Sequence, residues 1–88
     1  MLICGIDIGK NYHEACVIDE TGRQLAKTLR FPNTTAGAGT LMDYFHGCNP
    51  DKQTIVVGME ATGHYWLSLY CFLFDQGFQV NVINPLQS

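Results

Sequence analysis

Two apolar runs decide the fold of this chain: L-I-C-G-I-D-I at Leu2–Ile8 and T-I-V-V-G-M at Thr54–Met59. Both runs are short and rich in β-branched residues, as expected of strands buried inside a sheet. Asp7 lies within the first run and Glu60 directly follows the second. A carboxylate in an apolar strand is costly unless it is paired, protonated or bound to a cation. The pattern therefore predicts two central strands that each carry an acidic residue near the carboxyl end.

The segments around these two runs predict a three-stranded meander followed by two strand–helix–strand crossovers. Short connections join the first three strands, and Gly47 and Gly77 are expected to end the two helices. The remaining elements are expected at Glu14–Asp19 (strand), Arg23–Phe31 (strand), Ala36–His46 (helix), His64 or Tyr65 to Gln76 (helix) and Phe78–Ile83 (strand). The order is βββαβαβ, which predicts an α/β fold of the ribonuclease H-like type, a mixed sheet with helices on its faces.

The composition indicates one packed domain. Hydrophobic residues make up 47% of the 88 residues and charged residues 15%, a balance that favours a globular domain over a disordered chain. This length is enough for one core and too short for two. The net charge of −3 argues against a basic face that grips nucleic acid.

The cysteines and the first residues predict a cytoplasmic protein. None of the four cysteines belongs to a C-x-x-C pair, so we expect reduced, structural thiols rather than a zinc site. Met1 leads straight into the first apolar run without the pattern of a signal peptide. The longest apolar stretch, Tyr65–Phe74, is shorter than the roughly 20 residues that cross a membrane. We therefore expect a soluble protein that does not contact a membrane.

The two carboxylates suggest a site for a divalent cation. If the first and fourth strands are parallel neighbours, Asp7 and Glu60 lie side by side at the edge where open α/β sheets bind ligands. Neighbouring carboxylates repel each other unless a cation lies between them or one is protonated, and hard oxygen ligands suit Mg²⁺ or Mn²⁺. The alternative is structural: Asp7 caps a turn beside Lys10, and Glu60 caps the second helix.

Three histidines and one lysine are further candidates for site residues. Lys10 could lie near a phosphate or balance the carboxylates, and it could equally be a surface lysine. His64 closely follows Glu60 and could touch DNA or order the turn. His46 is expected to interact with the carboxyl end of the first helix, and His13 is expected to be solvated.

The second helix is apolar on nearly all sides. From Tyr65 to Asp75, only Ser68 and Asp75 interrupt its apolar and aromatic residues. Such a helix is normally buried on several sides, and one sheet face cannot cover it in so small a domain. We expect this helix to pair with another copy of the chain or with a further part of the protein.

Four segments resemble one protein family, the insertion-sequence transposases whose amino-terminal domain is similar to the RuvC Holliday-junction resolvase. These segments are G-I-D-I-G-K (Gly5–Lys10), H-E-A-C-V-I-D-E-T-G (His13–Gly22), G-M-E-A-T-G-H-Y-W (Gly58–Trp66) and V-N-V-I-N-P (Val80–Pro85). They span nearly the whole chain, and E-A-T-G-x-Y-W is the most specific of them. The chain departs from the pattern at Gly9, where many members have serine.

The resemblance implies a function and a partial active site. Members bind divalent metal through a tetrad of Asp, Glu, Asp and Asp, and its first two positions map onto Asp7 and Glu60. The other two acidic residues, and a serine of a separate carboxyl-terminal domain, map beyond Ser88. By resemblance the intact enzymes excise and insert a mobile DNA element. They do so with the help of a structured guide-type RNA that pairs with the DNA. With two of four ligands, these 88 residues are expected to bind metal weakly and not to cut DNA alone.

Two alternatives come from other classes. Sugar-kinase and actin-like ATPases begin with a similar I-D-x-G strand, but they typically place Thr or Ser soon after that glycine. In this chain Lys10-Asn11-Tyr12 follows instead. The other alternative is a non-catalytic transposase remnant that acts only in assembly.

Overall fold

The computed structural model describes residues 1–48, 54–60 and 63–83. In this part the chain forms five strands and two helices in the predicted order. The strands are β1 (Leu2–Asp7), β2 (Tyr12–Ile18), β3 (Leu29–Pro32), β4 (Ile55–Glu60) and β5 (Gln79–Ile83), and the helices are α1 (Thr35–Cys48) and α2 (Leu67–Asp75). Residues 61–62 and 84–85, which belong to two of the segments that resemble the family, lie outside the described residues.

The strands form one mixed sheet in the order β3-β2-β1-β4-β5. β1 is antiparallel to β2 and parallel to β4, β2 is antiparallel to β3, and β4 is parallel to β5. The two apolar runs of the sequence are therefore the central pair, as predicted. The predicted fold class, a ribonuclease H-like mixed sheet, is confirmed.

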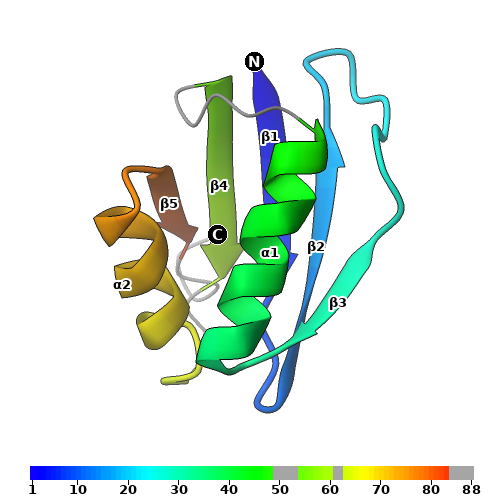
Figure 1. Cartoon of the computed structure of the whole chain (residues 1–88). Coiled ribbons are helices and arrows are strands. Elements are labelled where there is room, and N and C mark those ends of the chain that lie inside the picture. Colours follow the sequence, from blue (N-terminus) through cyan, green and yellow to red (C-terminus); the bar gives the residue numbers. More distant parts are fainter. Residues whose placement is uncertain (49–53, 61–62, 84–88) are drawn as a thin grey trace.

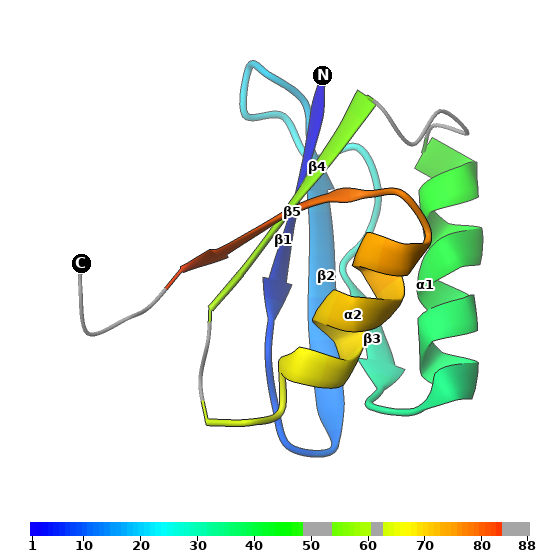
Figure 2. The ribbon, with the colours of Figure 1, turned by 90° about the vertical axis from the view of Figure 1, so that its left-hand side faces the viewer.

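Both helices pack on the same face of the sheet, which Figure 2 shows from the side. The crossovers from β3 to β4 and from β4 to β5 carry the chain across the sheet in one direction (Figure 1). Right-handed connections that all advance in one direction place their helices on one face. In the described residues the opposite face of the sheet therefore carries no helix.

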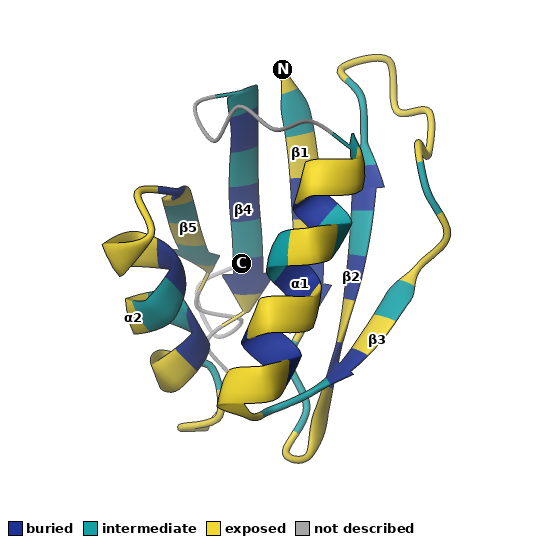
Figure 3. Cartoon of the chain, in the orientation of Figure 1, coloured by how far each residue is buried: buried dark blue, intermediate teal, exposed yellow. Residues whose placement is uncertain are grey.

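The core lies between the sheet and the helices (Figure 3). Alternate strand residues point into it, because successive side chains of a strand point to opposite faces. The largest fully buried side chains include Phe31, Phe45, Leu41, Ile55 and Met59. These side chains come from β3, α1 and β4, and the same core includes residues of β1, β2 and α2, so both central strands are held in place.

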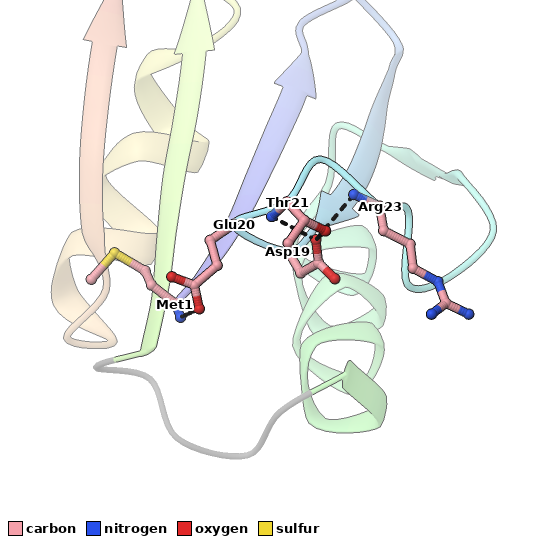
Figure 4. A network of polar contacts seen from close by, with 5 residues as sticks. All are labelled: Met1, Asp19, Glu20, Thr21 and Arg23. Carbon is pink, nitrogen blue, oxygen red and sulfur yellow. Dashed lines mark hydrogen bonds and ion pairs between the residues drawn. The ribbon is translucent and has the colours of Figure 1, made fainter.

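The edge strand β3 is shorter than predicted. Residues 19–28 form a connection rather than a strand, and Asp19 organises its first turn: its Oδ1 accepts hydrogen bonds from the backbone N–H and hydroxyl of Thr21 and from the N–H of Arg23 (Figure 4). These bonds lower the pKa of Asp19. In the same view the amino terminus of Met1 forms an ion pair of 3.5 Å with Glu20. Local bonding of this kind competes with strand pairing.

The first helix starts close to its prediction and ends later. Thr34 caps it, because its Oγ1 accepts a hydrogen bond of 3.0 Å from the N–H of Gly37. A Cβ at Gly37 would overlap the carbonyl oxygen of Pro32, so this position requires glycine. Gly47 was predicted to end the helix and does not, because Cys48 packs against the core and holds one more residue in the last turn.

The second helix ends as predicted. Gly77 adopts a left-handed conformation with φ of +90°, and its N–H donates to the carbonyl of Phe74, as expected of a glycine directly after a helix. No helix in the described part of the chain is long and apolar enough to cross a membrane.

Candidate functional site

A row of three carboxylates crosses the helix-free face of the sheet. Asp7 is the last residue of β1 and faces Glu14 of β2 in the antiparallel register. The parallel register of β1 and β4 pairs Ile6 with Met59, so Asp7 and Glu60 are the next residues on neighbouring strands. Adjacent strands lie about 4.8 Å apart, and all three side chains are exposed. The structure therefore places Asp7 and Glu60 side by side, as predicted, and adds Glu14.

Paired glycines form the floor beside this row. Gly5 of β1 and Gly58 of β4 are register partners, and they share the open face with Asp7 and Glu60 two residues further on. No atom lies within 4 Å of the position of a Cβ at either glycine. The backbone is thus bare there, and a cavity of about 440 Å³ opens above it, with Asp7, Glu14 and Glu60 in its lining. Because glycine has no side chain, these two positions on the central strands leave room for a ligand to approach the carboxylates.

One positively charged side chain, that of Arg30, lies at the end of the row. Arg30 of β3 faces Glu14 in the register, yet its guanidinium stacks over the ring of Tyr12 at 4.5 Å from the centroid. Both side chains, with Asp7 and Glu14, line a neighbouring cavity of about 280 Å³. In the described residues no ion pair neutralises the three carboxylates of the row. An arginine held by an aromatic ring is well placed to meet a phosphate next to the acidic groups.

The other two candidates lie outside the lining of these two cavities. Lys10 is exposed in the turn between β1 and β2, and its carbonyl accepts a hydrogen bond of 3.4 Å from the Asn33 side chain. His64 is exposed in the turn before α2, where its carbonyl accepts from the N–H of Leu67. Both residues lie near the carboxyl ends of the central strands, and their positions support no further role in the site.

His13 was predicted to be solvated, and the structure contradicts this. The side chain points into the helix-covered face of β2 and is only 1% exposed. Its ring packs edge-on against Phe31 with centroids 5.4 Å apart, and its Nδ1 accepts a hydrogen bond of 3.2 Å from the N–H of Gly9. Burial lowers the pKa of His13, and the nearby Asn33 side chain partly opposes this. Because β2 begins at Tyr12, earlier than predicted, the alternation puts His13 inside.

Sequence reasoning also missed Glu14 and Arg30 as neighbours of the site. The signal was present in the alternation: once Tyr12 begins the strand, Glu14 must share the face opposite to His13. Arg30 could be placed only by knowing the pairing of β2 with β3, which depends on the length of their connection.

The donor set of the row suits a hard divalent cation, although it does not form a complete centre. Carboxylate oxygens are the ligands that Mg²⁺ and Mn²⁺ prefer, and Asp7, Glu14 and Glu60 supply only such oxygens. Over the residues 1–48, 54–60 and 63–83, no three His, Cys, Asp or Glu side chains converge closely enough to hold a metal ion. The side-by-side pair therefore fits part of a cation site.

The mixed sheet in the order 3-2-1-4-5, with acidic residues at the ends of its central strands, defines an α/β domain of the ribonuclease H-like class. Solved structures agree on the fold. The chain is similar to the RuvC protein of T. thermophilus, solved in complex with a Holliday junction substrate, with a TM-score of 0.68 and 16% identity over 99% of this chain and 66% of that one. It is also similar to the fowlpox virus Holliday junction resolvase, with a TM-score of 0.59 and 22% identity over 97% of this chain and 62% of that one.

Sequence comparison gives the family. Residues 4–88 match the family model of the IS110-type DEDD transposases, described as "Transposase", and the chain belongs to this family. It is 32% identical over 82 residues to the pilin gene-inverting proteins of Moraxella lacunata and Moraxella bovis, which covers 93% of this chain. The chain spans about a quarter of the length of these relatives, 24%. The resemblance drawn from the sequence is confirmed, and the ATPase alternative is not favoured.

Proposed function

We propose that this chain forms part of the catalytic domain of a transposase or recombinase that breaks and joins DNA strands of a mobile element. The observation that carries the proposal is the pair Asp7 and Glu60, side by side at the carboxyl ends of β1 and β4. In this proposal they are metal ligands and catalytic residues, and a divalent cation such as Mg²⁺ or Mn²⁺ would supply charge stabilisation and an activated oxygen for phosphodiester chemistry.

The open face can hold these neighbouring carboxylates even when no cation is bound. Two unit charges 4 Å apart repel by about 1 kcal/mol in bulk water, so exposed carboxylates at strand spacing are tolerable in the free chain. The same exposure leaves their oxygens available, since no described hydrogen bond engages the side chain of Asp7 or Glu60. A negatively charged row also repels DNA phosphates, so DNA would approach this face only with cations or with basic parts of a longer protein.

Partners and location follow from the same proposal. The RuvC structure contains a Holliday junction substrate and the Moraxella relatives are named for inverting a pilin gene, which supports DNA as the substrate here. A structured guide-type RNA is the further partner that the family implies. Such a protein would act in the cytoplasm of a prokaryote. Alone, the 88 residues should not cut DNA, and robust Mg²⁺-dependent cleavage by this chain would contradict that expectation.

Paramagnetic Mn²⁺ tests the proposed cation site directly. Titration into the ¹⁵N-labelled chain should broaden the amide signals of Asp7, Glu14 and Glu60 before others, because the relaxation effect falls steeply with distance from the ion. Asp7→Asn and Glu60→Gln should each weaken the effect. We expect about a 10- to 100-fold loss of affinity or more, the range for residues that merely support metal ligands.

Glu20→Gln is the matched control for this titration. Glu20 is an exposed glutamate in the connection after β2, ion-paired with the amino terminus, so its removal should leave the broadening unchanged. Broadening that follows Glu20, or that spreads evenly over all exposed acidic residues, would refute a site at Asp7 and Glu60.

We further propose that the chain self-associates through α2. The helix buries only Leu69 and Leu73, whereas Leu67 is 50% and Phe74 64% exposed. Tyr70 packs edge-on against Trp66 and stacks on Phe74, with centroid distances of 5.8 and 6.1 Å. An apolar and aromatic surface of this kind marks an association site.

Sedimentation analysis measures this association. The unmodified chain should form dimers or larger species at micromolar concentration. The pair Leu67→Ser and Phe74→Ser should shift it to the monomer, because each removes an exposed apolar contact. Ile3→Ser, on the open face, is the control. A clean monomer of the unmodified chain at all concentrations would contradict the proposal.

A further inference from the structure

A third cavity lies on the helix-covered side, apart from the acidic row. It has a volume of about 270 Å³ and lies between the start of α1, the end of β3 and the first turn of α2. Its polar lining includes His13, Asn33, Thr34, Thr35 and Ser68. No acidic side chain belongs to this lining, in contrast to the two cavities of the open face.

His13 presents a buried hydrogen-bond donor to this cavity. Its Nδ1 accepts from the N–H of Gly9, so in the neutral imidazole the proton is on Nε2, which is then a donor. This Nε2 is buried and has no partner within hydrogen-bonding geometry in the part of the chain that the structure describes, although the Asn33 side chain of the same lining is near enough to raise the pKa of His13. A buried donor without a partner costs free energy, so a group in the cavity that accepts a hydrogen bond from it would be stabilised there.

The start of α1 adds donors to the same cavity. The Thr34 hydroxyl caps the N–H of Gly37, and the first carbonyl to accept within the turn is that of Thr34, from Ala38. The N–H groups of Thr35 and Ala36 precede that bond, so no preceding helical carbonyl pairs with them. The positive end of a 14-residue helix thus faces the cavity, and α2 begins at the same end of the sheet (Figure 1).

We infer that this cavity binds a phosphate group, with the Nε2–H of His13, the first turn of α1 and the hydroxyls of Thr35 and Ser68 as donors. An oxyanion accepts several hydrogen bonds at once, and helix starts favour negative charge. The phosphodiester of a nucleic-acid strand is the expected source. The cavity lies at the end of the sheet where β1 and β4 end, and Glu14 of the acidic row directly follows His13 on the opposite face. Only this choice of source rests on the proposed function.

Titration with inorganic phosphate, followed by NMR at constant ionic strength, tests the site. The amides of Thr35 and Ala36 and the ring of His13 should shift together and saturate. His13→Leu should weaken binding by about 10-fold, the scale of one hydrogen bond to a charged group. The exposed His46, changed to Gln, is the matched control and should leave binding unchanged.

A second variant guards against misfolding of His13→Leu. The double change Thr35→Ala and Ser68→Ala removes two hydroxyls and no buried contact, and it should weaken phosphate binding about 3- to 10-fold. Shifts that do not saturate, or that survive both variants unchanged, would overturn the inference.

An oligothymidylate without terminal phosphates then identifies the source. The same shifts with this strand support a nucleic-acid phosphodiester, whereas a response to inorganic phosphate alone supports the phosphate site and overturns the nucleic-acid source. Mn²⁺ broadening at Asp7 and Glu60 in the same samples separates this result from the proposed function, because either response can be lost while the other remains.

Discussion

The two faces of the sheet differ although they are made by the same strands. On β1, Cys4 and Ile6 point beneath the helices and are at most 4% exposed, whereas Ile3 on the open face is 44% exposed. Asp7, one residue after Ile6, lies on the open face. A shift of one residue in register would exchange the two sets of side chains. The covered face therefore determines the register, and the register determines where the carboxylates lie.

This division lets one strand contribute to the core on one face and carry a proposed cation ligand on the other. Residues of the covered face cannot change without disturbing the core, whereas the open face keeps paired glycines and exposed acidic groups that contribute little to packing. The cavity lined by His13 is the exception, because it puts polar donors on the covered side.

The largest difference between the faces should appear on truncation of apolar side chains. Leu41 is fully buried against the covered face, so Leu41→Ala should lower the free energy of unfolding by about 2–5 kcal/mol. That is a large share of the roughly 5–15 kcal/mol of a small domain. Ile3→Ala, on the open face, should lower it by about 1 kcal/mol or less. Urea unfolding of both variants measures this, and equal losses would show that the open face is covered in solution.

Two glycines of the same helix should respond with opposite sign. Gly37 faces the Pro32 carbonyl, and Gly37→Ala should destabilise the chain by about 1–3 kcal/mol, as overpacking does. Gly39 is exposed and has no atom near its missing Cβ, so Gly39→Ala should stabilise by about 0.5–1 kcal/mol through helix propensity. Calorimetric melting temperatures report both. A stabilising Gly37→Ala would mean that the β3–α1 connection can move.

Much of this fold could be read from the sequence because its central strands are short apolar runs that leave few alternatives. The adjacency of Asp7 and Glu60 followed from the predicted topology. The family resemblance fixed the same two positions independently. The end of the second helix was predicted correctly, because Gly77 adopts a left-handed conformation there. The end of the first helix was not, because the helix continues through Gly47 to Cys48, which packs against the core.

The rest depended on contacts between segments far apart in the sequence. The burial of His13 follows from its packing on Phe31, and the position of Arg30 from the pairing of β3 with β2. The common side of both helices follows from the direction in which the crossovers advance, which the element order does not reveal. In each case the missing information was tertiary, and local patterns carry little of it.

The buried histidine predicts a loss of stability in acid. Burial lowers the pKa of His13 in the folded chain below its usual value of 6.5. The unfolded chain therefore binds a proton first, and the free energy of unfolding falls as the pH drops below about 6.5 until the folded pKa is reached. The slope can reach about 1.4 kcal/mol per pH unit for one proton. Urea unfolding from pH 7.5 to 5 measures it, and His13→Leu should remove the slope while His46→Gln keeps it.

The smallest effect concerns two thiols on opposite faces of neighbouring strands. Burial, followed by the nearby Cys16 and Cys48, raises the pKa of Cys4 to about 12, and its side chain is fully buried on the covered face. Cys16 faces the open side next to Gly5 and is partly exposed. Since the thiolate is the reactive form, iodoacetamide at pH 8 should label Cys16 well before Cys4, and Cys4 only as fast as the chain opens. Mass spectrometry of the two peptides gives the order. Faster labelling of Cys4 would mean that the helices leave the covered face more readily than the packed core suggests. The two faces would then differ in the folded structure, but the covered face would not protect its thiol from the reagent.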